Sequence, residues 1–176
     1  SDRRLPCAGS SLSDFIINTD LVSNEALNKE LNNKIFFKLD NFQKTGSFKI
    51  RGALNHLLLL KEQGEMPKKV VVVTSGNHGA AVAYACKKFN IECLIYTSKI
   101  TPIFKINNMK KFGAEIVITQ KRKEANKLAA EKIKEGYHFI HPSSGDDVIA
   151  GQGTIFIEAI EKEEEFDAVF VPCGGG

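Results

Sequence analysis

A lysine beside a glycine- and serine-containing turn is the residue of this chain best suited to covalent chemistry. Lys49 follows Gly46 and Ser47 and lies in a segment whose periodicity predicts a helix over residues 47–63. A lysine amine attacks carbonyl groups when a sheltered pocket keeps it unprotonated. The turn leaves room beside the amine, and Phe48 can pack its aromatic edge on a bound ring. We therefore expect an imine-forming lysine, with an ordinary first-turn lysine and Ser47 as the N-cap as the alternative.

A second polar turn follows an apolar run at residues 70–73. Its residues are Ser75, Gly76, Asn77, His78 and Gly79. The free backbone N–H groups and the helix dipole at such a junction favour a carboxylate or a phosphate. Asn77 offers both a donor and an acceptor, and the Ser75 hydroxyl can pass on a proton. Simple capping by the serine or the asparagine is the alternative, but a cap does not need the two glycines and the histidine as well.

The chain ends in a glycine run that could contact a phosphate. Cys173, Gly174, Gly175 and Gly176 follow the apolar residues 168–171, which predict a strand. Pro172 ends the hydrogen-bond ladder of that strand. A glycine run after a strand can cradle a phosphate through its amides. Alone this is a weak signal, because a glycine terminus is often only a tail.

Alternation of short β-branched runs with helix-period segments predicts an α/β protein with a largely parallel sheet. The predicted strands cover residues 35–39, 70–74, 92–96, 115–119, 138–140 and 168–171. The predicted helices cover residues 47–63, 77–89, 102–112, 121–135 and 145–161. The run at 70–73 is apolar at every position, as expected for a strand covered on both faces.

Composition excludes several functional classes. The 176 residues are 43% apolar and 26% charged with a net charge of +3, which is ordinary for a soluble protein and gives no case for nucleic acid or acidic membranes. The longest apolar runs are too short to span a bilayer, and no secretory signal opens the sequence. Cys7, Cys86, Cys93 and Cys173 lack C-x-x-C spacing. Buried reduced thiols in the cytosol are therefore favoured over a zinc site.

Several charged residues are interpreted as structural. Two basic groups fall on predicted helices and indicate solvated outer faces rather than a ligand site. They are Lys105, Lys110 and Lys111, and Lys121, Arg122 and Lys123. The acidic residues 161–165 indicate a solvated helix end. His78, His138 and His141 have no metal-ligand spacing with acidic residues, and His56 is interpreted as structural.

Together these segments resemble the fold-type II pyridoxal-phosphate enzymes, which have the tryptophan synthase β-like fold, and specifically their serine/threonine dehydratase and serine racemase branch. The matching segments are residues 36–39, 43–53, 74–79, 148–154 and 171–176, in the order and spacing of the family. The resemblance covers nearly the whole chain from residue 34. The Lys-Ile-Arg sequence at 49–51 and the histidine after Ser-Gly-Asn are similar to this branch in particular.

The resemblance implies that Lys49 holds pyridoxal 5'-phosphate as a Schiff base. Phe48 would lie against the pyridine ring, and Asn77 would hydrogen-bond the phenolic oxygen. The start of the phosphate cradle would be formed by Gly174, Gly175 and Gly176. Residues 75–79 would bind the substrate carboxylate.

The implied reaction is an ammonia-lyase (dehydratase) reaction through a Cα carbanion, which converts L-serine or L-threonine to a 2-keto acid and ammonia. A serine racemase, in which Lys49 and Ser75 act on opposite faces, is the nearest alternative. A catalytically inactive homologue or fragment that binds the cofactor or an amino acid is a second one. Ala80 stands where the family commonly has glutamine, which puts any contact of that side chain in doubt.

The resemblance also implies a division into domains. Residues 69–144 would form a small α/β domain, and residues 1–68 and 145–176 would be parts of an incomplete large domain. Because the chain ends within the expected phosphate loop, we expect this segment alone to be inactive. The absent half would carry the group that meets the pyridine nitrogen and any ligands of a divalent metal or nucleotide activator. The family implies a cytoplasmic homodimer.

Overall fold

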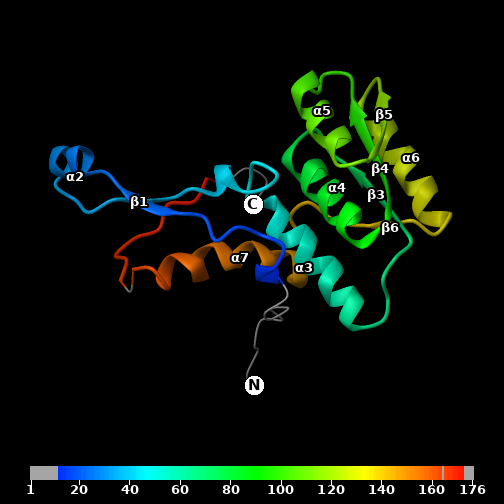
Figure 1. Cartoon of the computed structure of the whole chain (residues 1–176). Coiled ribbons are helices and arrows are strands. Elements are labelled where there is room, and N and C mark those ends of the chain that lie inside the picture. The colour runs from blue at the N-terminus through cyan, green and yellow to red at the C-terminus, as the bar shows by residue number, and fades with distance from the viewer. Residues whose placement is uncertain (1–11, 164, 173–176) are drawn as a thin grey trace.

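A four-stranded parallel sheet forms one layer of the computed structural model, which describes residues 12–163 and 165–172. Its strands are β3 (Lys69–Val73), β4 (Glu92–Ser98), β5 (Glu115–Thr119) and β6 (His138–Phe139). They lie in the order β5-β4-β3-β6, so β3 and β4 are central (Figure 1). All the pairings are parallel, because a helix follows each of β3, β4 and β5 and returns the chain to the same end of the sheet.

Helices cover both faces of this sheet. They are α4 (Asn77–Phe89), α5 (Ile103–Lys111) and α6 (Arg122–Lys134). Val70 and Val72 share an apolar core with α4 and α5, whereas Val71 and Val73 pack with α6 in a second core. Successive side chains of a strand point to opposite faces, so the apolar run of β3 fills both cores. Figure 1 shows α6 on the side of the sheet opposite α4.

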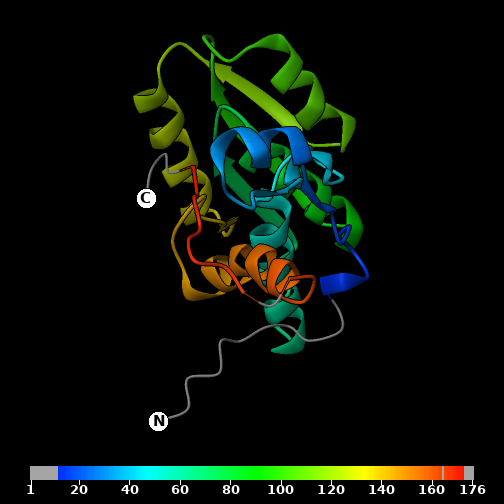
Figure 2. The same ribbon diagram turned by 90° about the vertical axis from the view of Figure 1, so that its left-hand side faces the viewer.

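Outside the sheet, two long helices pack against each other. They are α3 (Lys49–Glu62) and α7 (Asp146–Ile160), and Figure 2 shows α7 lying across α3. Upstream of α3 the chain forms a small antiparallel pair and a 3-10 turn. These elements are β1 (Leu21–Ser23), α2 (Glu25–Leu31), β2 (Phe36–Lys38) and η1 (Asp40–Phe42). The connection from η1 into α3 carries Lys49.

The predicted α/β architecture is confirmed. Five of the predicted strands and all five predicted helices are present, with ends shifted by at most two residues. The strand predicted over 168–171 is wrong: the segment is irregular, and Val169, Phe170 and Val171 are 55%, 93% and 75% exposed. No strand among the described residues lies beside it, and backbone groups cannot form a ladder without a neighbour. The apolar composition of residues 168–171 is therefore not sufficient for them to form a strand.

Cys86 and Cys93 are buried and free, which confirms the prediction of reduced thiols, whereas Cys7 and Cys173 lie outside the described residues. Within the described part of the chain, none of the helices has the length and apolar character needed to cross a membrane.

Candidate active site

Lys49 is the first residue of α3. The N-cap of that helix is Phe48, at φ −60° and ψ −18°, and it makes no capping hydrogen bond through its side chain. The alternative in which Ser47 caps the helix is therefore wrong. The Ser47 and Thr45 hydroxyls are buried and have no hydrogen-bond partner among the described residues. Two unused polar groups thus lie just before the candidate nucleophile.

The amine of Lys49 is sheltered. Its Nζ donates a hydrogen bond of 2.6 Å to the carbonyl oxygen of Pro142 and lies 5.0 Å from the centre of the Phe48 ring. Burial lowers the pKa of Lys49 from its ordinary value of 10.5, because a charged ammonium loses hydration in a partly apolar setting. The neutral amine, which is the nucleophilic form, is therefore more accessible than in a surface lysine.

The turn before Lys49 is shaped by Gly46 and anchored by Gln43. Gly46 has φ +78°, a conformation that glycine adopts without strain. Its N–H donates to the carbonyl oxygen of Gln43 at 2.7 Å. The Gln43 side chain in turn accepts from the N–H of Ile17 and donates to its carbonyl oxygen. The turn is thereby fastened to the segment that precedes β1.

The 75–79 turn joins the end of β3 to the start of α4. Gly76 is the N-cap of α4, and no side chain caps the helix, so the capping alternative is wrong here too. Ser75 and Asn77 are exposed, as a substrate or cofactor contact requires. The first N–H groups of α4 have no side-chain acceptor from a cap, and such groups attract anions.

The side chain of His78, a predicted substrate-binding residue, lies inside the protein. Its ring is buried, and Nε2 donates to the carbonyl oxygen of Ile140 at 3.0 Å. Burial lowers the pKa of His78 to about 4, more than the hydrogen bond to Ile140 raises it, and the nearby charge of Lys49 lowers it further. The ring is therefore neutral at ordinary pH, and its hydrogen bond attaches the turn to the segment after β6.

The segment after β6 brings the two turns together. His78 bonds to the carbonyl of Ile140, and Lys49 bonds to the carbonyl of Pro142, two residues farther along. The start of α3 and the start of α4 are thus attached to neighbouring points of one segment. The structure brings together Phe48, Lys49 and the 75–79 turn, whereas Gly174, Gly175 and Gly176 lie outside the described residues.

A buried ionic cluster two residues after Lys49 was not predicted. The Arg51 guanidinium is 0% exposed and makes ion pairs of 2.8 Å with Asp40 and 2.6 Å with Glu158. Burial alone would lower the pKa of Arg51, but the hydrogen bonds that it donates to both carboxylates reverse the effect and raise it. The cluster ties η1, the first turn of α3 and α7 together, and so fixes the position from which Lys49 projects. Only the Lys-Ile-Arg match indicated that Arg51 mattered.

The crossing of α3 and α7 depends on close backbone contact. A Cβ on Gly151 would lie 2.6 Å from the carbonyl oxygen of Arg51, and a Cβ on Gly52 would lie 2.8 Å from that of Val148. Both glycines are therefore required by packing. This explains the segment at 148–154, for which the sequence offered no chemical role.

The other histidines form a polar contact between elements. His56 Nδ1 pairs with the Asp147 carboxylate, and its Nε2 lies 2.6 Å from Nε2 of His138. These contacts link α3, β6 and α7, in agreement with the structural interpretation of His56. In residues 12–163 and 165–172, no group of three or more His, Cys, Asp or Glu side chains is placed to hold a metal ion.

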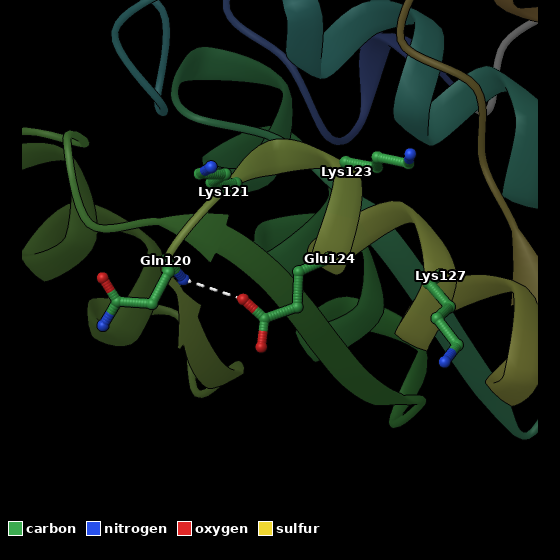
Figure 3. Close-up of a pocket in the computed structure, with 5 residues that line it drawn as sticks. All are labelled: Gln120, Lys121, Lys123, Glu124 and Lys127. Atoms are coloured by element: carbon green, nitrogen blue, oxygen red, sulfur yellow. Dashed lines mark hydrogen bonds between the residues drawn. The ribbon is translucent and has the colours of Figure 1, made fainter.

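The basic residues at the start of α6 surround a surface hollow of about 530 Å³. Figure 3 shows its lining side chains spread apart rather than converging. The lining residues are Gln120, Lys121, Lys123, Glu124 and Lys127. The Glu124 carboxylate accepts a 3.0 Å hydrogen bond from the backbone N–H of Gln120 and so serves the helix start. Lys121, Arg122 and Lys123 are exposed, which confirms a solvated face.

Comparison with known proteins agrees with this geometry. The pyridoxal-phosphate dependent enzyme family matches residues 12–176. Serine racemase of Dictyostelium discoideum is 37% identical over 92% of this chain and 50% of its own length. The L-threonine ammonia-lyase of Thermotoga maritima is 37% identical over 94% of the chain and 42% of its own length.

A solved structure extends the comparison. The processed form of threonine deaminase isoform 2 from Solanum lycopersicum superposes with a TM-score of 0.86 at 32% identity, covering 94% of this chain and 46% of the other. The chain spans about half the length of the curated relatives it matches. A family match over most of the sequence, together with the sheltered lysine beside a polar helix start, assigns this chain to the pyridoxal-phosphate dependent enzymes.

Proposed function

We propose that the protein is an ammonia-lyase that converts L-serine or L-threonine to a 2-keto acid and ammonia. The observation that carries the proposal is the half-buried Lys49 amine, with its lowered pKa, next to the start of α4. Serine racemase activity is the alternative, and it is supported equally by the relatives. The exposed hydroxyl of Ser75 is the feature of this chain that a racemase would need.

The residues around Lys49 fit pyridoxal phosphate. The Phe48 ring is 39% exposed and lies beside the amine, so an aromatic ring can stack on it. Asn77 is exposed at the start of α4 and offers a hydrogen-bond donor. The unpartnered hydroxyls of Thr45 and Ser47 add two polar groups next to the site. The phosphate contacts that we propose for Gly174, Gly175 and Gly176 lie outside the described residues.

Each residue of this site has a defined task. When bound, pyridoxal phosphate supplies an electron sink that stabilises the negative charge left on the substrate Cα. The Lys49 amine, once its hydrogen bond to the carbonyl oxygen of Pro142 is broken, accepts the Cα proton. The backbone N–H groups of the 75–79 turn hold the substrate carboxylate and thereby orient Cα toward that amine. In a racemase, the Ser75 hydroxyl would return a proton to the opposite face.

The two-domain organisation belongs to the same proposal. Residues 69–144 would form the small domain, which the enclosure of the four-stranded sheet within Lys69–Phe139 supports. Residues 1–68 and 145–176 would belong to the large domain, and the exposed apolar residues 169–171 would pack on the rest of it. A cytoplasmic homodimer completes the proposal, and the free thiols of Cys86 and Cys93 suit a reducing compartment.

Covalent labelling of the full-length protein tests the proposal. We expect incubation with pyridoxal phosphate and borohydride reduction to give a single adduct on Lys49, located by peptide mapping. Lys49→Ala should lose the adduct and the turnover of serine and threonine. The matched control is Lys44→Ala, because Lys44 is an exposed lysine of the same turn. It should keep both.

The reaction is then assigned from its products. Keto acid from L-serine or L-threonine supports the ammonia-lyase, and D-serine without keto acid supports the racemase. An adduct on Lys49 without either product would favour the cofactor-binding homologue. A full-length protein with no adduct on Lys49 would contradict the enzyme altogether.

A further inference from the structure

Lys105 does not behave as the predicted solvated lysine. It lies in the first turn of α5 and is half-buried, whereas Lys110 and Lys111 on the same helix are exposed. Its stem runs along Gly76 of the 75–79 turn. A Cβ on Gly76 would lie 3.6 Å from Cδ, 3.9 Å from Cε and 3.4 Å from Nζ of Lys105. The ammonium is therefore placed at the turn.

The charge of Lys105 has no counterion in the described structure. No carboxylate of the described residues forms an ion pair with it, and the ring centre of Phe104 lies 6.0 Å from Nζ. Lys69, Lys132 and Lys34, which lie elsewhere on the surface, each pair with a glutamate. The half-buried side chain of Lys105 is thus ordered beside Gly76 without the return of an ion pair. Its position is explained if an anion arrives from outside.

Gly76 keeps that ammonium open to the turn. Its φ of −171° is extended backbone that any residue can adopt, so conformation does not require glycine here. A side chain at this position would instead stand against Nζ of Lys105. Without one, the ammonium and the free N–H groups at the start of α4 can face the same ligand.

We propose that Lys105 is a specificity residue whose ammonium pairs with the carboxylate of the amino-acid substrate held at the 75–79 turn. This inference rests on the proposed function and adds a residue outside the family-like segments 36–39, 43–53, 74–79, 148–154 and 171–176. One carboxylate oxygen accepts hydrogen bonds from the backbone N–H groups of the turn, and the other pairs with the ammonium of Lys105. Such charge-assisted contacts are stronger than those between neutral groups.

The substitution Lys105→Met in the full-length protein tests this pairing. The measured quantities are KM and kcat for L-serine, the inhibition constant of L-serinamide, whose amide carries no charge, and the Kd of pyridoxal phosphate. We expect the KM of L-serine to rise roughly 10- to 100-fold, the loss typical of one charged hydrogen bond. The inhibition constant of serinamide and the cofactor Kd should stay unchanged.

Two further variants keep the test sharp. Lys110→Met removes an exposed charge from the same helix and should leave the KM of serine unaltered. Gly76→Ala places a methyl group against Nζ while leaving Lys105 intact, and it should raise the KM of serine in the same direction. Circular dichroism of each variant checks that the fold is retained.

The alternatives give different results. An unchanged KM for serine, or equal losses for serine and serinamide, would overturn the pairing and leave the proposed function standing. A weaker cofactor Kd with unaltered KM would show instead that Lys105 serves the cofactor phosphate. A parent protein that binds the cofactor but neither serine nor threonine would overturn the proposed function and this inference with it.

Discussion

The starts of α3 and α4 carry the candidate active-site residues, and the protein holds the two helix starts in place by different forces. At α3 the anchor is charge: Arg51 is 0% exposed and pairs with Asp40 and Glu158. At α4 one neutral hydrogen bond, from His78 to Ile140, adds to an anchor made chiefly of apolar volume, because β3 leads into the turn and Val70, Val71 and Val72 are each 0% exposed.

This difference predicts which changes destabilise each region. A buried ionic cluster stabilises only while every charge keeps its partner, since a single unpaired charge is costly in the interior. An apolar core loses stability in proportion to the volume removed, and it does so at any pH. The position of Lys49 should therefore depend on complementary charges, and that of the 75–79 turn on close packing.

Removal of the central charge should give the largest effect. Arg51→Met leaves Asp40 buried without its arginine partner and leaves Glu158 with only Lys38, whose Nζ lies 2.6 Å away. We expect the free energy of unfolding to fall by about 3–5 kcal/mol. Urea unfolding of the full-length protein measures this loss. Arg122→Met is the matched control, because Arg122 is exposed at the start of α6 and should change stability by less than about 0.5 kcal/mol. Equal losses for the two arginines would contradict the charge-based anchor.

Glycine-to-alanine substitutions in the two regions should change the free energy of unfolding less than the loss of Arg51 does. A Cβ on Gly151 would meet backbone atoms of α3 at 2.6 Å, whereas one on Gly79 would meet only side chains, at 2.3 Å from the Sδ of Met109 and 2.7 Å from Cγ2 of Thr74. A methionine side chain can move aside, but a helix backbone cannot. We expect Gly151→Ala to destabilise by about 2–3 kcal/mol and Gly79→Ala by about 1 kcal/mol.

Gly153 offers the control for that pair. It lies in α7, and a Cβ added there would meet nothing within 4 Å, so Gly153→Ala should stabilise by up to about 1 kcal/mol through helix propensity. Urea unfolding again gives the three values. A larger loss for Gly79→Ala than for Gly151→Ala would show that the sheet side of the molecule is the less adaptable one.

The same contrast explains what could be predicted from the sequence. Residues 70–73 and the helices after them carry strong local periodicity and glycine stops, so these elements were predicted closely. Elements β1, α2 and η1, which are three, seven and three residues long, were missed. The Asn24 side chain that caps α2 was a usable signal, since asparagine is a preferred N-cap.

The contacts that hold the site in place join residues far apart in the sequence, so the local pattern could not predict them. Arg51 bonds to partners 11 and 107 residues away in the sequence, and no spacing rule predicts such pairs. In the sequence, Lys105 is indistinguishable from the other lysines of an amphipathic helix. Only the fold shows that it lies against Gly76. The candidate residues themselves could be named because their chemistry is local: a lysine after a glycine turn, and a polar turn at a helix start.

Acid should affect the two regions differently, and this is the smallest of the three expected effects. Burial by itself raises the pKa of Asp40, but hydrogen bonds from Arg51 and Thr19 outweigh it, so that the pKa lies below its ordinary value of 3.8. A carboxyl with a depressed folded pKa binds more protons in the unfolded state, so its stabilisation is present above pH 3.8 and is lost as the pH falls through the lower folded value.

The test compares two variants over pH. Asp40→Asn should cost stability at neutral pH, and this cost should shrink as the pH falls from 3.8 through the lower folded pKa, below which the parent carboxyl is protonated as well. Val72→Ala removes volume from the β3 core and should cost roughly 2 kcal/mol at every pH at which the protein folds. Urea unfolding along the pH series gives both curves. If the Asp40→Asn curve stayed parallel to that of the parent protein, the charge of Asp40 would contribute nothing to the stability of the start of α3. If the Asp40→Asn curve alone converged with that of the parent at low pH, the acid sensitivity of the Lys49 region would be due to its buried ionic cluster.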